Sequence, residues 1–551
     1  MKKRGLLTLL LGTIFTFVLL SAETKFNLSF IETLTSITAA ELQSELYFLA
    51  SDEMQGREIN TPFNDITALY LAHRFQLMGL QPIKKNTYFQ TFKLVFSKLD
   101  KRNRLKIRYT NSSLSVNGTL KKDFFPSPLS AKGSVTAPLI FAGYGITAPE
   151  EDYDDYRELS ASQKIVVIIR HEPRMTDLNS PLDKLLNSNH SENFKKILNA
   201  QNHGATGVIL VPDMTNHSKK RKFSRRAELV WPENSSKNIY TLKTWTEQIQ
   251  IPVLFSSAKF ANRLLKFSRK KLDKIQQKID QQHRPNSFEL LRVKATIETN
   301  LTREEISVRN TLAYLPGSDL TLKDEVVIIS AHFDHVGSHN GKIFNGADDD
   351  GSGTAGLLEI AQAYALSSEK PKRSLLFAAW NAEESGLLGS RYYVQSPIFP
   401  LSKTAAVFQM DMIGRNEEIP DPKNPRFFGL EKQTADENTN SVNVLGYTRS
   451  NDLRNLVASS NEHIGLELKF RYDDSSANLL RRSDNWPFLL NGVPALFFHT
   501  GLHPDYHQPT DTPEKINYPK LEKVVRLVFL SSWHAANNQK KPLLDPKVWN
   551  K

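Results

Sequence analysis

Four apolar runs in the second half of the chain each end directly at polar side chains of the kind that bind metal ions. The runs have the length and the β-branched, aromatic and alanine content of buried strands, and helical patterns lie between them. This alternation of strand and helix predicts an α/β fold with a mainly parallel central sheet flanked by helices. The runs are residues 325–331, 374–379, 405–410 and 494–498.

Candidate ligand and catalytic side chains follow all four runs. In an open α/β sheet, ligands bind beyond the carboxyl ends of the strands, so these side chains are expected to meet at one edge. The first run leads into His332 and Asp334, the second into Glu383 and Glu384, the third into Asp411, and the fourth into a loop with Tyr506 and His507.

Three adjacent aspartates, Asp348 to Asp350, lie in a glycine-rich loop between the first two runs. Neighbouring carboxylates repel one another unless a cation or strong hydrogen-bond donors compensate. The glycines permit tight backbone geometry, and a helix is expected to follow the loop. We therefore expect Asp349 to point its carboxylate toward the same edge of the sheet.

The donor chemistry indicates zinc, with manganese or cobalt as alternatives. The chain has no cysteine, so a metal must be held by imidazole and carboxylate groups. Five such ligands are too many for one catalytic zinc, and they suit two ions that share one carboxylate. Glu383 is then left free to take a proton from the attacking water as the general base. The five predicted ligands are His332, Asp349, Glu384, Asp411 and His507.

The N-terminus has the pattern of a secretory signal. Lys2, Lys3 and Arg4 precede an uncharged stretch over 5–20, and Ser21-Ala22 provides small residues at a cleavage point. We expect a signal peptide over 1–22 and an exported protein, periplasmic or secreted. An uncleaved N-terminal anchor is the alternative, and no other stretch approaches the length needed to span a membrane.

The formal net charge of +12 comes partly from clustered lysine and arginine. These clusters are interpreted as solvated surfaces, because no aromatic residues alternate with them and no nucleic-acid-binding module is recognisable. No nucleic-acid partner is therefore expected. One basic cluster, at 269–271, lies in a predicted helix over 258–282.

The order of patterns along the chain divides it into parts. Residues 36–120 begin with helical stripes, one of them containing Ile66, Leu69 and Phe75, and continue as alternating strands. Residues 125–300 form a β-rich block without a cluster of ligand-type residues, and residues 301–545 contain the four runs. We therefore expect a split catalytic domain over 36–120 and 301–545, with an inserted domain over 125–300.

These motifs resemble the bacterial leucyl-aminopeptidase-type two-zinc exopeptidases, whose superfamily includes glutamate carboxypeptidase II and the transferrin receptor. The resemblance implies the zinc exopeptidase fold and two Zn²⁺ ions. His332 and Asp411 would bind one ion, Glu384 and His507 the other, and Asp349 would bridge them. The matching segments are 331–334, 346–353, 381–390, 411–414 and 506–512.

The resemblance also implies roles for residues that do not bind metal. Glu383 would be the general base, Asp334 would orient the His332 ring, and Tyr506 would hydrogen-bond the developing oxyanion. The block at 125–300 resembles a protease-associated domain. Four other histidines match no ligand position and are interpreted as structural: His335, His339, His499 and His503.

Taken together, these features predict an exported zinc-dependent aminopeptidase that hydrolyses peptide substrates. A carboxypeptidase or dipeptidase of the same fold is the main alternative, and Arg415, Arg481 and Arg482 are candidates for binding a substrate carboxylate. A glutaminyl cyclase and a non-catalytic binding module are further alternatives. The complete ligand set and Glu383 favour hydrolysis over both. Side-chain preference and oligomeric state are left open.

Overall fold

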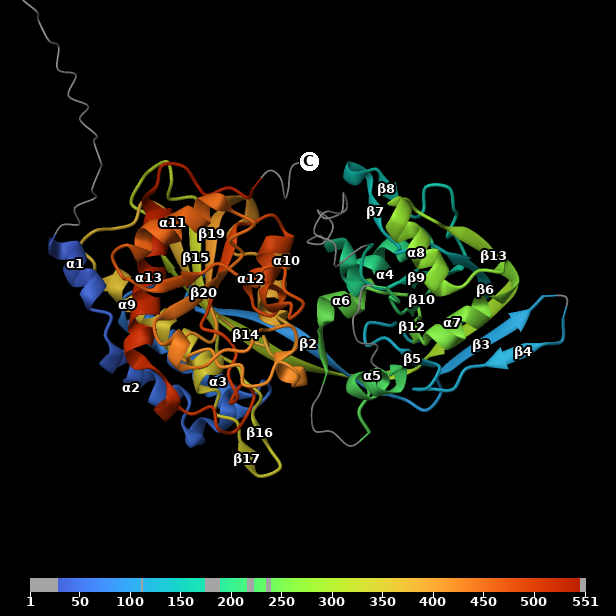
Figure 1. The fold of residues 1–551 in the computed structure, drawn as a ribbon, viewed down its shortest axis with the longest axis horizontal. Helices are drawn as coiled ribbons and strands as arrows, with labels where there is room; N and C mark the ends of the chain where they lie inside the picture. The colour runs from blue at the N-terminus through green and yellow to red at the C-terminus, as the bar shows by residue number, and fades with distance from the viewer. Residues whose placement is uncertain (1–27, 111, 174–188, 216–221, 234–238, 546–551) are drawn as a thin grey trace, which may run out of the picture.

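The computed structural model describes residues 28–110, 112–173, 189–215, 222–233 and 239–545. The predicted signal peptide over 1–22 lies outside these residues. Within the described ranges, no helix combines the length and the apolar character needed to cross a membrane. The structure has two lobes, each built on its own large sheet (Figure 1).

The larger sheet has ten strands, and its centre is parallel. Strands β18, β15, β19 and β22 run parallel to one another, and antiparallel strands extend the sheet on both sides. The four central strands are the four apolar runs of the sequence, so the predicted α/β fold is confirmed, although the sheet as a whole is mixed. The order is β11 (Tyr240–Leu242), β2 (Phe89–Leu99), β14 (Leu301–Leu315), β18 (Ser374–Trp380), β15 (Val326–His332), β19 (Thr404–Met410), β22 (Ala495–His499), β20 (Ser441–Leu445) and β21 (Glu467–Lys469), with β1 (Gln81–Pro82) paired to β14.

The register of the central strands aligns their carboxyl ends. His332 pairs with Trp380, and Met410 pairs with Phe498. The loops that leave these strands therefore start from one edge of the sheet, as the sequence predicts.

Helices cover both faces of this sheet and fix its position. One face packs against six helices, whose apolar side chains join alternate residues of β15 in one core. The other face packs against two short helices and several loops. The first group is α1 (Leu28–Thr35), α2 (Ala39–Leu49), α3 (Pro62–Leu77), α9 (Gly353–Leu366), α11 (Asn451–Asn461) and α13 (Tyr518–Asn537), and the second is α10 (Leu388–Gln395) and α12 (Asn485–Leu490).

Helix α3 packs through a different face from the one expected. Of the predicted stripe, Phe75 is buried, but Ile66 and Leu69 are 45% and 53% exposed, and Ala68 and Leu71 are buried in their place. The helix lies against β14 and η1 (Asp52–Arg57), and its buried positions also include polar residues. Small side chains let a helix approach its neighbours closely, so the larger apolar residues were a misleading guide here.

The smaller lobe is an eight-stranded mixed sheet with helices. Its order is β4 (Ser115–Asn117), β3 (Arg104–Tyr109), β13 (Phe288–Thr299), β6 (Gly133–Phe141), β9 (Ile165–Ile169), β10 (Gly207–Val211), β12 (Val253–Ser256) and β5 (Phe124–Pro126). Its helices are α4 (Asn193–Asn202), α5 (Phe223–Val230), α6 (Lys243–Gln248), α7 (Ala258–Leu264) and α8 (Leu272–Gln282). Two small hairpins complete the fold: β7 (Thr147–Ala148) with β8 (Tyr153–Asp154), and β16 (Ser338–His339) with β17 (Lys342–Ile343).

The predicted domain bounds remain a prediction, and the two sheets do not follow them strand by strand. Strands β3 and β4 lie in the smaller sheet, and β11 lies in the larger one. The identification of the smaller lobe as a protease-associated domain remains a prediction. The basic helix expected over 258–282 is two helices, because Arg269 adopts a left-handed conformation with φ 52° between them.

Two long strands and one helix connect the lobes. Strands β2 and β14 pair along 11 residues of β2 (Figure 1). Strand β2 continues into β3 of the smaller sheet, and β13 of the smaller sheet continues into β14. Helix α10, which follows Glu383 and Glu384 in sequence, also contacts the smaller lobe. Arg391 forms an ion pair with Glu192, and Thr244 donates a hydrogen bond of 3.0 Å to Gln395. The smaller lobe is therefore attached next to the segment that carries the predicted general base.

Candidate metal centre

The first predicted ligand, His332, is the last residue of β15. His332 is fully buried, and its backbone N–H donates to Asp350 at 3.0 Å. Its Nδ1 lies 3.1 Å from the carbonyl oxygen of Asp334, which fixes the ring and leaves Nε2 directed at the neighbouring carboxylates. The imidazole is thus presented for ligation through Nε2.

The three adjacent aspartates have three different roles. Asp350 accepts backbone hydrogen bonds from His332, Gly353 and Met412, so both of its oxygens hold the surrounding backbone. Asp348 lies 3.2 Å from Nε2 of His503 and accepts from the backbone of Gly414. Asp349 directs its carboxylate at His332 and His507, and Asp350 also has an oxygen within 4.8 Å of the donor atoms of His332 and Asp411. The Asp349–Asp350 peptide bond is cis.

Asp334 holds the loop of Glu383 and Glu384 in place. Its two carboxylate oxygens accept the backbone N–H groups of Glu383 at 3.0 Å and Glu384 at 3.3 Å. The His332 ring is contacted by the backbone of Asp334 and not by its carboxylate. Nδ1 of His332 lies 3.1 Å from the carbonyl oxygen of Asp334 and 3.9 Å from its carboxylate. Asp334 therefore positions both His332 and the Glu383–Glu384 backbone.

All five predicted ligands come together around the two oxygens of Asp349. Oδ1 lies 3.3 Å from Nε2 of His332, which is in turn 3.7 Å from Asp411. Oδ2 lies 2.9 Å from Nε2 of His507, which is 3.0 Å from Glu384. One carboxylate thus lies between two donor groups, each with a histidine and a further carboxylate, which is the arrangement that two metal ions sharing a bridging aspartate require.

The donor atoms fit metal ions by an observation independent of their residue types. Among the described residues, Nε2 of His332 and Oε1 of Glu384 are buried without a hydrogen-bond partner. Buried polar atoms in native proteins are nearly always satisfied, so orphans in one place need a partner of another kind. A cation at each donor group satisfies them. The assignment of the five ligands nevertheless remains a prediction.

The charges of the site favour ionised carboxylates at the ligand positions. Burial would raise the pKa of Glu384, but the nearby His507 and the contact with His335 bring it down to about 2. Burial likewise opposes ionisation of Asp349, and hydrogen bonds from His332 and His507 hold its pKa well below the usual range. Carboxylates must be ionised to bind a metal, so these two are prepared for ligation.

Glu383 has a different environment. Burial raises the pKa of Glu383 well above its usual value, although His332 opposes this. Its Oε2 lies 3.8 Å from Nε2 of His332, at the edge of the first donor group. A carboxylate beside the ligands whose proton affinity is raised by burial is suited to accept a proton, which is consistent with the predicted general base.

Tyr506 packs directly against a predicted ligand. Its ring stacks on that of His507 with centroids 4.0 Å apart. Burial and the carboxylates of Asp349 and Glu384 raise the pKa of Tyr506 well above its usual value, so the hydroxyl stays protonated and can donate. Its role toward an oxyanion remains a prediction.

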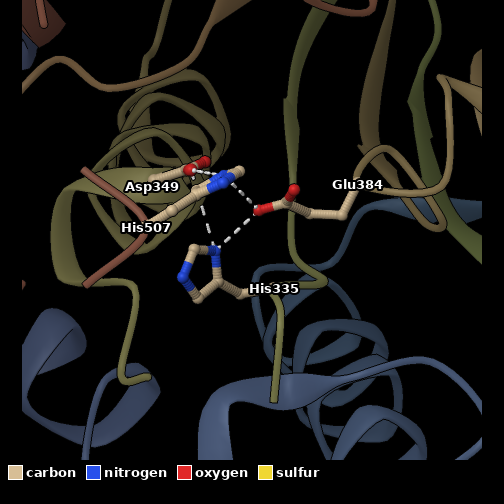
Figure 2. A group of neighbouring side chains, drawn as sticks. All are labelled: His335, Asp349, Glu384 and His507. Atoms are coloured by element: carbon tan, nitrogen blue, oxygen red, sulfur yellow. Dashed lines mark ion pairs between the residues drawn. The ribbon is translucent and has the colours of Figure 1, made fainter. Parts of the chain in front are cut away.

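The structure adds one residue that sequence reasoning missed. His335, interpreted as structural, lies with Asp349, Glu384 and His507 in one group of donor atoms (Figure 2). His339, His499 and His503 lie outside both donor groups that the described residues form. The sequence pointed to His335 only through its closeness to His332 in the chain. His339 is also close in the chain and lies outside the donor groups, so closeness alone did not distinguish the two histidines.

With this geometry established, the comparisons with known proteins identify the segment that carries it. Residues 310–531 match the model of peptidase family M28. This segment belongs to peptidase family M28. The predicted superfamily is thereby confirmed, and the matched segment contains every predicted ligand, Glu383 and Tyr506.

Individual relatives agree with the family. Aminopeptidase YwaD of Bacillus subtilis (strain 168) is 30% identical over 225 residues, 40% of this chain and 43% of the relative. Leucine aminopeptidase 2 of Trichophyton equinum is 30% identical over 208 residues, 38% of this chain and 35% of the relative. The chain thus spans less than half of the length of these curated relatives. A solved aminopeptidase from Aneurinibacillus sp. strain AM-1 is 20% identical, with a TM-score of 0.49, and the match covers 94% of this chain and 98% of that one.

Proposed function

We propose that the chain is a zinc-dependent exopeptidase that acts as an aminopeptidase on peptides. The observation that supports this most strongly is the position of Asp349. One of its oxygens faces His332, which also contacts Asp411, and the other faces His507, which also contacts Glu384. Membership of the matched segment in a peptidase family and the names of the two relatives, both aminopeptidases, support the same proposal.

The residues of the site divide the work of hydrolysis among them. His332, Asp411, Asp349, Glu384 and His507 would hold two Zn²⁺ ions. Bound there, the ions would supply Lewis-acid polarisation of the scissile carbonyl and lower the pKa of water. Glu383 takes the proton of the attacking water and passes it to the leaving amine. Tyr506 donates its hydroxyl proton in a hydrogen bond to the carbonyl oxygen as negative charge develops there.

The arginines near the site support an aminopeptidase over a carboxypeptidase. Arg415 forms an ion pair with Asp505 at 3.0 Å, and Arg482 donates to the carbonyl of Ala477 at 2.6 Å. Recognition of a substrate carboxylate usually employs an arginine that presents two parallel donors. Both of these arginines direct Nη2 at groups of the protein itself, which makes such a pair of donors less available. The site itself is rich in carboxylates, which suit a free α-amine.

The decisive experiment combines a substrate panel with one substitution. Purified protein should release p-nitroaniline from aminoacyl-p-nitroanilides, should fail on the same compounds with an acetylated α-amine, and should lose activity to a chelator and regain it with zinc. Glu383→Gln should reduce kcat by about 10²–10⁴-fold because proton transfer is lost. The exposed Glu467→Gln serves as the matched control and should retain full activity.

Two outcomes would contradict the proposal. Hydrolysis of peptides only from the carboxyl end, with two zinc ions bound, would replace the aminopeptidase by a carboxypeptidase. Full activity of Glu383→Gln would remove the assigned general base. Metal content should be measured for every variant, because Glu383 is not proposed to hold zinc and its substitution should leave two ions per chain.

We further propose that the protein is exported. The proposal rests on the basic start, the uncharged stretch over 5–20 and the small residues at 21–22. Expression in a bacterial host should give a protein in the periplasm or medium whose mass lacks residues 1–22. Recovery of the full-length chain from the cytoplasm alone would contradict it, and recovery of the full-length chain with the membrane would favour an uncleaved anchor.

A further inference from the structure

His335 brings a second imidazole to one of the two donor groups. Its Nδ1 lies 2.9 Å from Oε1 of Glu384 and 3.8 Å from Oδ2 of Asp349. Figure 2 shows the four side chains of this group pointing toward one another, with dashed lines joining the facing atoms. Each residue offers one ligand atom, and the four atoms all lie within 4.8 Å of one another.

The spacing of these atoms is that of a tetrahedral metal site. Zinc bonds of about 2.0–2.1 Å at tetrahedral angles place neighbouring ligand atoms roughly 3.3 Å apart. The four ion-pair distances within the group are 2.9, 3.8, 2.9 and 3.0 Å, which bracket that value. The four donors can therefore surround one ion with little rearrangement.

The other donor group has only three ligands. It contains Nε2 of His332, Oδ2 of Asp411 and Oδ1 of Asp349. A carboxylate oxygen of Asp350 also lies within 4.8 Å of the donor atoms of His332 and Asp411. Both oxygens of Asp350 already accept backbone hydrogen bonds, three in all, so we assign Asp350 to holding the loops and not to the ion. The carboxylate of Glu383 approaches this group, 3.8 Å from Nε2 of His332.

The burial of His335 requires a partner for its ring. The side chain is 1% exposed, and neither ring nitrogen has a hydrogen-bond partner among the described residues. Burying an unsatisfied polar group costs about 1–3 kcal/mol, so a histidine kept there without a partner would destabilise the fold. Among the residues that the structure describes, the carboxylates within ion-pair distance of its ring are those of Glu384 and Asp349, both predicted ligands.

We propose that His335 is a metal ligand and that the two metal sites are unequal. The site of His335, Asp349, Glu384 and His507 is closed, with four protein donors. The site of His332, Asp349 and Asp411 has three protein donors and keeps an open position beside Glu383. Zinc sites with four protein ligands are typically structural, and those with three keep a position for water or substrate. The inference rests on the metal binding proposed above and adds which of the two ions faces the substrate.

The test measures metal binding and needs no peptide substrate. Cobalt(II) would be titrated into chelator-treated wild type, His335→Ala and the control His339→Ala, followed by d–d absorption and by competition with a chelator of known affinity. Four-coordinate cobalt absorbs more strongly than five- or six-coordinate cobalt. Wild type and His339→Ala should bind one tight and one weaker ion, with one strongly absorbing centre.

His335→Ala should weaken the tight ion by more than about 10-fold, since even residues that only orient a ligand change metal affinity by 10–100-fold. It should also lose the strong absorption, because cobalt left with three protein donors takes up two or more solvent molecules and becomes five- or six-coordinate. Where alanine prevents folding, His335→Leu fills the volume without supplying a donor and should give the same result. The ion held by His332 and Asp411 should keep its affinity.

Unchanged absorption in a folded His335→Ala would overturn the proposal, even with weaker binding, because it would make His335 an orienting partner of Glu384 only. Two ions of equal affinity in the wild type would also overturn it. The outcomes are separable from the proposed function. A wild type that binds two metals but hydrolyses no peptide would reject the peptidase and leave this inference standing, whereas a wild type that binds no metal would reject both.

Discussion

Substitution of Arg57 tests how the N-terminal segment supports the metal centre. Arg57 lies in η1, is 1% exposed, and donates four hydrogen bonds to carbonyl oxygens. Nε reaches Phe333 at 2.9 Å, Nη1 reaches Leu49 at 2.6 Å and Asn345 at 2.7 Å, and Nη2 reaches Gly346 at 2.8 Å. Phe333 follows His332, and Gly346 begins the aspartate loop, so one side chain joins both ligand-bearing segments.

The charge of Arg57 is retained in spite of its burial. Burial lowers the pKa of Arg57, and Asp350, Asp349, Asp511 and Asp334 oppose this. Hydrogen bonds from charged donors are stronger than neutral ones, at about 1.5–3 kcal/mol each, but the desolvation of the guanidinium offsets part of their sum. Removing one partner of a buried charged network typically costs about 3–5 kcal/mol, and we expect Arg57→Ala to lose that amount of unfolding free energy.

The measurement is urea unfolding of the chelator-treated protein, so that metal binding does not mask the loss. The control is Arg157→Ala, which removes an exposed ion pair with Asp152 and should leave the unfolding midpoint unchanged. Arg57→Ala should also weaken zinc binding by about 10–100-fold, because the two loops that carry His332 and Asp349 lose their common support. A loss of less than about 1 kcal/mol would refute the reasoning, since such a loss is typical of a solvated surface contact.

Three further predictions concern stability and coupling to the site. Burial and the nearby Glu41 raise the pKa of Glu359 to about 8 from 4.5, so its ionisation opposes folding fully above pH 8 and not at all below pH 4. Glu359→Gln should therefore stabilise the protein at pH 9 by up to about 5 kcal/mol and leave it unchanged at pH 4, and a difference that does not grow with pH would contradict this. Chelation should lower the melting temperature and added zinc should restore it. A free zinc concentration of 100 times the dissociation constant should stabilise the protein by about 2.7 kcal/mol. A melting temperature independent of zinc would contradict metal binding by the folded protein. Asn64 of α3 and Asn381, just after β18, exchange side-chain amide hydrogen bonds of 3.1 and 2.9 Å. Asn64→Ala should lower the free energy of unfolding in urea by about 2 kcal/mol and should lower kcat by displacing Glu383. An unchanged kcat would show that the pair acts on stability alone.

The sequence by itself determined the central sheet and the placement of five ligand-type residues. Each of the four apolar runs is a buried parallel strand, and the structure gives each nearly the predicted bounds. Side chains that follow such strands meet because parallel register aligns carboxyl ends, and this consequence needs no knowledge of the loops. His332, Glu384 and Asp411 could be placed together for that reason.

Loop paths and packing decided what the sequence could not. The pattern of α3 gave the wrong buried face, since Ala68 and Ala72 pack inward while Leu69 is exposed. Asp348 to Asp350 look alike in the sequence, yet their contacts differ. Asp348 contacts His503, Asp350 uses both oxygens to accept backbone hydrogen bonds, and Asp349 directs its carboxylate at His332 and His507. These outcomes depend on contacts between segments far apart in the chain.

The same reason explains His335 and Arg57. His335 lies three residues beyond β15, so whether it turns into the site depends on the path of its loop. Arg57 holds that loop by donating a hydrogen bond to the carbonyl oxygen of Phe333, although the two residues are more than 270 positions apart in the chain. A local pattern carries no information about such a contact. Strand ends and residue types thus indicated the chemistry at the level of the sequence. Only the tertiary structure decided which donor side chains lie together, because that depends on distances of 2.9–3.8 Å between loops brought together by folding.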